Sequence, residues 1–150
     1  EFLKSDSYSS KLAKEVNTKG ELQPAFLAIW VWADYLTKNL NDKKHLILDG
    51  TPRKLNEAHV LDGAFSFYKR SNVNVIYINV SEDWATNRLK DRQRSDDTDA
   101  GIKKRLDWFD TETIEAIDFY KNNSNYNFFD INGEQSIEEV HNQIVQNLEK

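Results

Sequence analysis

An acidic residue and an arginine follow one short apolar run, and together they could bind phosphate and a metal ion. The run His45–Leu48 leads into Asp49-Gly50-Thr51-Pro52-Arg53. In an open α/β sheet, ligands bind beyond the carboxyl ends of the strands. There a carboxylate can hold a hydrated cation, and a guanidinium can contact two phosphate oxygens at once. Taken alone, however, Asp49 is better explained as a loop cap, and Pro52 with Arg53 as a surface turn.

A second group of charged residues lies further along a chain whose net charge is −5. Within about five helical turns it contains Arg88, Arg92, Arg94, Asp96, Asp97 and Arg105. Most charge runs of this kind form a solvated helix face, and Asp96-Asp97 alone is best explained as an N-cap before Thr98. However, Arg92 and Arg94 flank a break between two helical patterns. Phosphate binding favours arginine over lysine there, because the guanidinium presents a rigid fork of donors.

The elements that would position these residues alternate between helix and strand. Helices are expected over about 25–40, 55–68, 82–92, 99–120 and 137–148, with strands over 45–48, 73–80 and 128–131. The helix over 25–40 is apolar nearly all round, and the strand over 73–80 is apolar on both sides, so we expect both to be covered on several faces. This alternation predicts an α/β fold with a parallel sheet.

Local signals mark several helix ends. Gly20 is expected to end a first helix, and Thr98 to begin the long helix that follows the arginines. Ser136 and Glu139 have the spacing of a capping box for the last helix. These signals define where the loops between the elements begin.

Length and composition limit the class of protein. The chain of 150 residues has the size of one domain, and its acidic balance argues against non-specific nucleic-acid binding. It has no cysteine and no apolar run near the length of a membrane span, so we expect a cytoplasmic protein without a membrane partner. It contains no methionine and opens at Glu1 in sequence typical of mid-helix. We therefore expect it to be a piece of a longer protein.

Four segments, in this order and spacing, resemble the nucleoside monophosphate kinases of the adenylate kinase family. They are Lys19–Pro24, Asp49–Arg53, Arg94–Asp97 with Lys104–Leu106, and Ile131–Gly133. The resemblance covers nearly the whole chain and is closest to the short-lid form. It implies a P-loop kinase-like three-layer sandwich with a parallel sheet. The implied activity is transfer of the γ-phosphoryl group of ATP to AMP with Mg²⁺, which is mainly a matter of positioning and charge neutralisation.

The same resemblance implies a role for each candidate residue. The implied monophosphate site consists of Gly20, Leu22, Gln23, Gly50, Arg53 and Glu57. The implied catalytic residues are Arg92, Arg94, Arg105, Asp96 and Asp97. ATP would contact Arg88, Arg92 and Gln135, and Asp49 would hold magnesium through water. Residues 1–23 would be the C-terminal part of a monophosphate-binding helical insert, and residues 24–150 a core domain with a very short lid loop at 92–97.

The chain departs from the family in its glycine pattern. Its glycines, at 20, 50, 63, 101 and 133, do not have the spacing of a phosphate-binding loop. The family's first strand, which carries that loop, is also not found in this sequence. We therefore expect the 150 residues alone to be inactive and poorly stable, and to be completed by another segment, after which the protein would be a monomer.

Two residues leave the base preference open. Thr51 replaces an aromatic residue of the family, and Glu57 stands where adenylate kinases usually have glutamine. Glutamine both donates and accepts hydrogen bonds, whereas an ionised glutamate only accepts. One alternative is therefore a kinase for a pyrimidine or guanine monophosphate. Another is a non-catalytic nucleotide-binding fragment that needs a partner segment.

Overall fold

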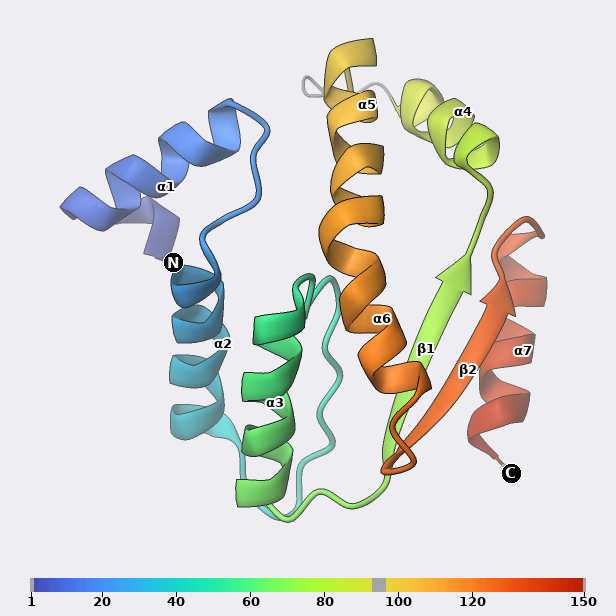
Figure 1. Cartoon of the computed structure of the whole chain (residues 1–150). Helices are drawn as coiled ribbons and strands as arrows, with labels where there is room; N and C mark the ends of the chain where they lie inside the picture. Colours follow the sequence, from blue (N-terminus) through green and yellow to red (C-terminus); the bar gives the residue numbers. More distant parts are fainter. Residues whose placement is uncertain (1, 93–96, 150) are drawn as a thin grey trace.

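The computed structural model describes residues 2–92 and 97–149. After a 3-10 turn at Phe2–Lys4, the elements are α1 (Tyr8–Thr18), α2 (Ala25–Asn39), α3 (Leu55–Phe67), β1 (Val73–Asn79), α4 (Glu82–Arg92), α5 (Asp99–Trp108), a π turn (Phe109–Thr113), α6 (Ile114–Lys121), β2 (Tyr126–Asn132) and α7 (Ile137–Leu148). Figure 1 shows α1 and α2 at one end of the molecule and the sheet with α7 at the other.

The strands β1 and β2 form a parallel pair. Their register runs from Val73 opposite Tyr126 to Asn79 opposite Asn132. Helix α6 packs against β2 and α3, and α7 packs against β2. The parallel sheet with helices packed on it confirms the predicted α/β class, and it is consistent with a P-loop kinase-like fold.

Helix α3 links two apolar clusters and so fixes the position of the loop before it. Ala58 packs with Ala116, Tyr120 and Tyr126, while Leu61 packs with Trp32 and Leu36 of α2. Burial raises the pKa of the Tyr126 hydroxyl on β2. This hydroxyl donates a hydrogen bond to Asp62 of α3. With α3 held from both sides, residues 49–54 at its N-terminus have a fixed support.

The predicted strand over His45–Leu48 is wrong. The segment forms no β-ladder with any part of the chain that the structure describes. Leu46 and Leu48 pack on the cluster of Trp32, Leu36 and Leu61, whereas Ile47 is 91% exposed. The alternation of buried and exposed residues is typical of a strand, but a strand also requires a hydrogen-bonded neighbour.

Two elements expected to be buried on several faces are instead exposed on one. On β1, Ile76 and Ile78 remain exposed. Helix α2 buries Leu27, Trp32 and Leu36, but the opposite face is exposed at Phe26, Trp30, Val31 and Tyr35. Trp30 is 49% exposed and packs edge-to-face with the ring of Phe2. The apolar pattern therefore overstated how many neighbours these elements have.

The predicted helix ends are confirmed. Gly20 has φ +62° and donates its backbone N–H to the Asn17 carbonyl at 2.9 Å, which ends α1 in a left-handed cap. The Thr98 hydroxyl accepts the Gly101 N–H at 3.1 Å at the start of α5. Ser136 and Glu139 form both bonds of a capping box at α7.

The long helix expected over 99–120 is interrupted by a π turn. The Ile114 N–H donates to the Phe109 carbonyl, five residues earlier. In the sequence, the apolar residues Ile102, Leu106 and Phe109 are followed by Ile114, a step of five. Because a π turn contains one more residue than an α turn, it accommodates this longer step. Such turns often occur at functional sites, and this one borders the cavity described below.

Alanine at Gly133 should destabilise the sheet by about 1–3 kcal/mol. The Gly133 N–H donates to the Asn79 carbonyl at 2.7 Å, and an added Cβ would lie 2.6 Å from side-chain carbons of both Ile78 and Val80. Urea unfolding would measure the change. Gly63→Ala, on α3 with nothing within 4 Å of the added carbon, is the matched control and should stabilise the protein slightly. Equal effects of the two variants would contradict the packing argument.

Candidate active site

Five of the six predicted monophosphate-site residues line one cavity. The cavity has a volume of about 490 Å³ and lies between α1, α2 and the N-terminus of α3. Its lining includes Leu22, Gln23, Gly50, Arg53 and Glu57. The sixth residue, Gly20, does not line it but ends α1 and turns the chain toward Leu22. The cavity therefore brings together two segments that are distant in the sequence, one around Leu22 and one around Arg53, as the sequence predicted.

The loop before α3 is closed by hydrogen bonds around Arg53. The Arg53 backbone N–H donates to Glu57 Oε2 at 2.9 Å, and its side-chain Nε donates to the Gly50 carbonyl at 2.8 Å. Glu57 is only 3% exposed, whereas Arg53 is exposed and forms no ion pair within the described part of the chain. The Arg53 guanidinium is thus held at the cavity wall by a neutral carbonyl rather than by an ion pair with another described residue.

Alanine at Gly50 should weaken monophosphate binding as well as fold stability. Gly50 has φ +71°, and an added Cβ would lie 3.2 Å from Arg53 Nη2, so the guanidinium must shift. Gly63→Ala is the control, because Gly63 lies on α3 with nothing within 4 Å of an added Cβ and does not line the cavity. Gly50→Ala should lose about 1 kcal/mol in chemical unfolding, whereas Gly63→Ala should not. Only Gly50→Ala should also lower AMP affinity in calorimetric titration; equal affinities would contradict the contact.

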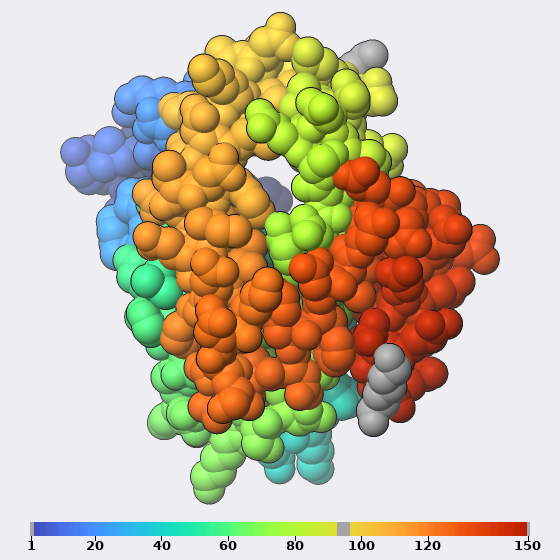
Figure 2. Space-filling model, turned by 45° about the vertical axis from the view of Figure 1, so that its right-hand side comes forward, coloured from blue at the N-terminus to red at the C-terminus, as the bar shows by residue number. Residues whose placement is uncertain are grey.

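A second, larger cavity adjoins the first. Its volume is about 1110 Å³, and residues 45–53, β1 and the α5–α6 region line it. Asp49, Arg53 and Arg105 are all among the lining residues. Leu22, Gly50, Thr51 and Arg53 line both cavities, so the two spaces meet beside Arg53. In Figure 2 the surface is deeply hollowed between α4 and α5.

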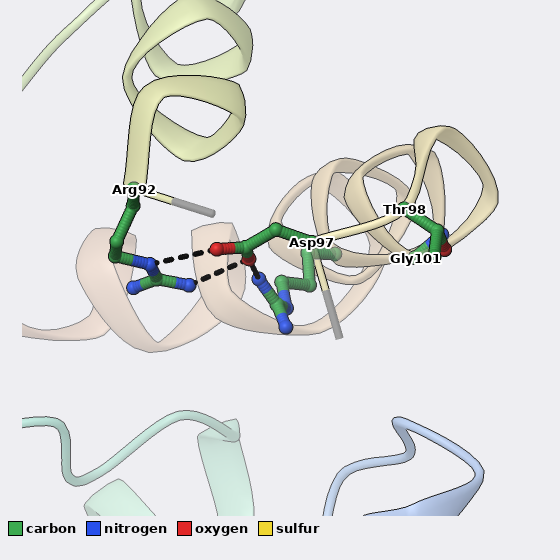
Figure 3. Close-up of polar contacts among 5 residues, drawn as sticks. Arg92, Asp97, Thr98 and Gly101 are labelled. Carbon is green, nitrogen blue, oxygen red and sulfur yellow. Dashed lines mark hydrogen bonds and ion pairs between the residues drawn. The ribbon is translucent and has the colours of Figure 1, made fainter. Parts of the chain in front are cut away.

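Two of the predicted catalytic arginines converge on Asp97. Arg92 Nε and Nη2 donate to the two carboxylate oxygens at 3.0 and 2.7 Å, and Arg105 Nη1 donates to Oδ1 at 2.6 Å (Figure 3). The Asp97 side chain is 1% exposed, and that of Arg105 is 24% exposed. Such charge-assisted bonds fix the planes of both guanidinium groups. Helices α4 and α5 are thus joined through one buried carboxylate that two guanidinium groups contact.

Other predicted residues lie apart from the two cavities or outside the described residues. Arg88 lies over the Trp84 ring on α4, at 5.9 Å, and does not line either cavity. Gln135 donates to the Asn132 carbonyl at 2.7 Å, in the loop after β2. Arg94 and Asp96 lie outside the described residues.

Among the lining residues of the first cavity, the sequence identified Gln23 and Thr51 as site candidates but missed Trp32. Gln23 Oε1, Trp32 Nε1 and Thr51 Oγ1 are buried and have no hydrogen-bond partner among the described residues. Trp32 had only the signal of a core residue, and nothing in the local pattern distinguished it. Sequence reasoning also missed the ion pair between Lys104 and Glu21, at 3.2 Å, which joins α5 to the loop after α1.

The residues present fit a magnesium ion held mainly by substrate. Within residues 2–92 and 97–149 there is no cluster of three or more histidine or acidic side chains that could hold a metal ion. Magnesium commonly keeps several waters and binds through one or two carboxylates together with substrate phosphates. Asp49 is exposed and lines the second cavity, so it can contribute a carboxylate of this kind.

Comparison with known proteins agrees with this geometry. The family model for adenylate kinase matches residues 1–125. The chain belongs to the adenylate kinase family. Adenylate kinase of Prochlorococcus marinus is 32% identical over 144 residues, which cover 95% of this chain and 76% of that protein. Adenylate kinase of Oenococcus oeni is 31% identical over 126 residues, covering 83% of this chain and 67% of the relative.

Family membership confirms the resemblance drawn from the four segments, and it makes this chain a nucleoside monophosphate kinase-type phosphotransferase. No described helix of this adenylate kinase family member has the length and apolar character needed to cross a membrane.

Proposed function

We propose that the protein transfers the γ-phosphoryl group of ATP to AMP, giving two molecules of ADP. The observation that carries the proposal is the shared wall of the two cavities. Arg53 lines the space that holds the predicted monophosphate residues and also the space that Arg105 lines. A monophosphate in the first cavity would therefore present its phosphate toward the second. The names of the relatives favour adenine among the bases.

The arginines supply the chemistry through charge and position. Arg53 would bind the α-phosphate of AMP, whose oxygen attacks the γ-phosphorus of ATP while the bond to the β–γ bridging oxygen breaks. Arg92 and Arg105, oriented by Asp97, would neutralise charge on the transferring group. Little covalent work is required of the protein in this reaction, so rigid donors account for most of the catalysis. Magnesium, when bound, would neutralise the triphosphate, with Asp49 holding it through water.

The remaining parts of the site are assigned by the resemblance. Arg88 and Gln135 would contact ATP, and the short lid at 92–97 would include Arg94 and Asp96. Residues 1–23 would form the monophosphate side of the site, with Gly20 positioning the loop that carries Leu22 and Gln23. The Lys104–Glu21 ion pair supports this arrangement, because it connects that side to the arginine-bearing helix α5.

We further propose that an additional strand completes the kinase. The second cavity lies between residues 45–49 and β1, two extended segments that do not pair with each other. A strand placed there could bond to both and bring the glycine-rich phosphate loop of the family to the cavity. On this proposal the 150 residues bind monophosphate but do not turn it over, and the completed protein is a cytoplasmic monomer.

A coupled assay of the full-length protein tests the proposed function. With ATP and Mg²⁺, AMP should support ADP formation, and UMP, CMP and GMP should be compared at equal concentrations. A preference for another monophosphate would favour the second candidate, for which the acidic Glu57 in the cavity is the specific observation. Binding without turnover in the full-length protein would favour the non-catalytic fragment. No ADP and no binding with any monophosphate would contradict the proposal.

A further inference from the structure

The loop after β2 is hydrogen-bonded to the short connection that leads from β1 into α4. The Gly133 N–H donates to the carbonyl of Asn79, the last residue of β1, at 2.7 Å. The Ser81 N–H donates to Glu134 Oε1 at 2.6 Å, although the two residues are 53 positions apart. Hydrogen bonding to Ser81 lowers the pKa of the Glu134 carboxyl, so this group is ionised at neutral pH. A carboxylate from a distant segment therefore contacts the start of α4 (Figure 1).

Glu134 supplies the part of a helix cap that α4 lacks. The Ser81 hydroxyl accepts the Trp84 N–H at 3.3 Å, which is the first half of a capping box. The second half requires a glutamate or glutamine three residues after the cap, and Trp84 occupies that position. Glu134 gives the Ser81 N–H the carboxylate that a capping box would provide, and its negative charge suits the positive end of the helix dipole.

Helix α4 is anchored at its two ends by polar contacts, and none of its residues is buried. At the end opposite Glu134, Arg92 contacts Asp97 at 2.7 Å and Lys90 contacts Asp99 at 3.1 Å. Ser81 and Arg92 are separated by about 16 Å of helix, so a tilt of about 10° at Ser81 would move Arg92 by about 3 Å. Such a shift is as long as a hydrogen bond. The orientation of the Arg92 guanidinium therefore depends on how firmly the first turn of α4 is held.

We propose that Glu134 is a positioning residue for phosphoryl transfer, which acts by holding α4 so that Arg92 is aimed at the transferring group. The inference rests on the proposed function, since that function assigns Arg92 to this group. Glu134 lines neither cavity, so it acts through the helix and does not touch the substrates.

Steady-state kinetics of the full-length protein test this assignment. Glu134→Ala should lower kcat about tenfold, because Arg92 is displaced, and should leave KM for AMP nearly unchanged. Glu134→Gln keeps an acceptor for the Ser81 N–H and should retain most of the activity. Glu138→Ala, the loss of an exposed glutamate on α7, is the matched control and should leave kcat unchanged.

A double-mutant cycle shows whether Glu134 acts through Arg92. In an Arg92→Lys background, Glu134→Ala should cause less than about a twofold further loss of kcat, because the side chain that it positions is already altered. Changes at sites this far apart otherwise act independently, so an effect on folding alone would make the two losses multiply.

Hydrogen exchange on the same full-length variants measures the contact without turnover. Glu134→Ala should speed exchange of the α4 amides about threefold or more and leave those of α7 unchanged, since only α4 loses an anchor. If α4 exchange is unchanged, or if the losses of kcat multiply in the double variant, the inference is wrong and the proposed function stands. If the unchanged full-length protein forms no ADP from ATP and AMP, the proposed function is wrong and the inference fails with it.

Discussion

Replacing Arg105 with lysine in the full-length protein should lower turnover about a hundredfold, because one donor to the transition-state charge is lost. Arg105 uses Nη1 for Asp97, at 2.6 Å, and it also lines the larger cavity. A guanidinium can contact the carboxylate and a phosphate with different nitrogens at the same time. A lysine ammonium is a single point charge at the end of a flexible stem, so it would serve one partner at the expense of the other.

Steady-state kinetics would separate this effect from a change in binding. The Michaelis constant for AMP should change little, since Arg105 is assigned to the transferring group. Lys103→Gln, an exposed change on the same helix, is the control and should keep nearly full turnover. If turnover falls less than tenfold in Arg105→Lys, Arg105 only forms an ion pair with Asp97 and does not stabilise the transition state.

Replacing Arg53 with alanine should weaken AMP binding by roughly tenfold to a hundredfold, the range expected for a lost charge-assisted hydrogen bond to a buried anion. The guanidinium lies where the two cavities meet, and its Nε bond to the Gly50 carbonyl holds it there. Adenosine, which has no phosphate, should bind the unchanged chain and Arg53→Ala equally. That comparison shows whether the phosphate is what Arg53 recognises.

Lys38→Ala serves as the matched control for charge. Lys38 pairs with Asp34 on α2 at 2.7 Å and is largely exposed, so its loss changes net charge without touching either cavity. AMP affinity should be the same as in the unchanged chain. If Arg53→Ala also binds AMP with unchanged affinity, the assignment of Arg53 to the monophosphate fails.

Local signals in the sequence predicted local structure well. The N-caps at Thr98 and Ser136 and the glycine cap at Gly20 depend on residues within one turn, and all three are confirmed. The π turn at Phe109–Thr113 was not predicted. We expected one continuous helix, although the five-residue apolar step from Phe109 to Ile114 is visible in the sequence. A five-residue apolar step inside a helical pattern is therefore a usable signal for a π turn.

Features that depend on distant neighbours were harder to predict. His45–Leu48 has the composition of a strand, but a ladder requires a partner that its own residues do not specify. The exposed faces of α2 and β1 were likewise not predicted, because the residues of an element do not specify what packs against it. The family was more predictable, because the order of four segments along the chain identified it. The unpartnered Gln23 and Trp32 atoms became visible only once α1 and α2 were packed around the cavity.

The central claim is that guanidinium groups from three separate segments meet around one phosphate chain. A crystal structure of the full-length protein with two nucleosides joined through a run of phosphates would test it most directly. We expect Arg53, Arg92 and Arg105 each to lie within about 3 Å of phosphate oxygens of the same ligand. A ligand bound elsewhere, with these three side chains directed into solvent, would contradict the account.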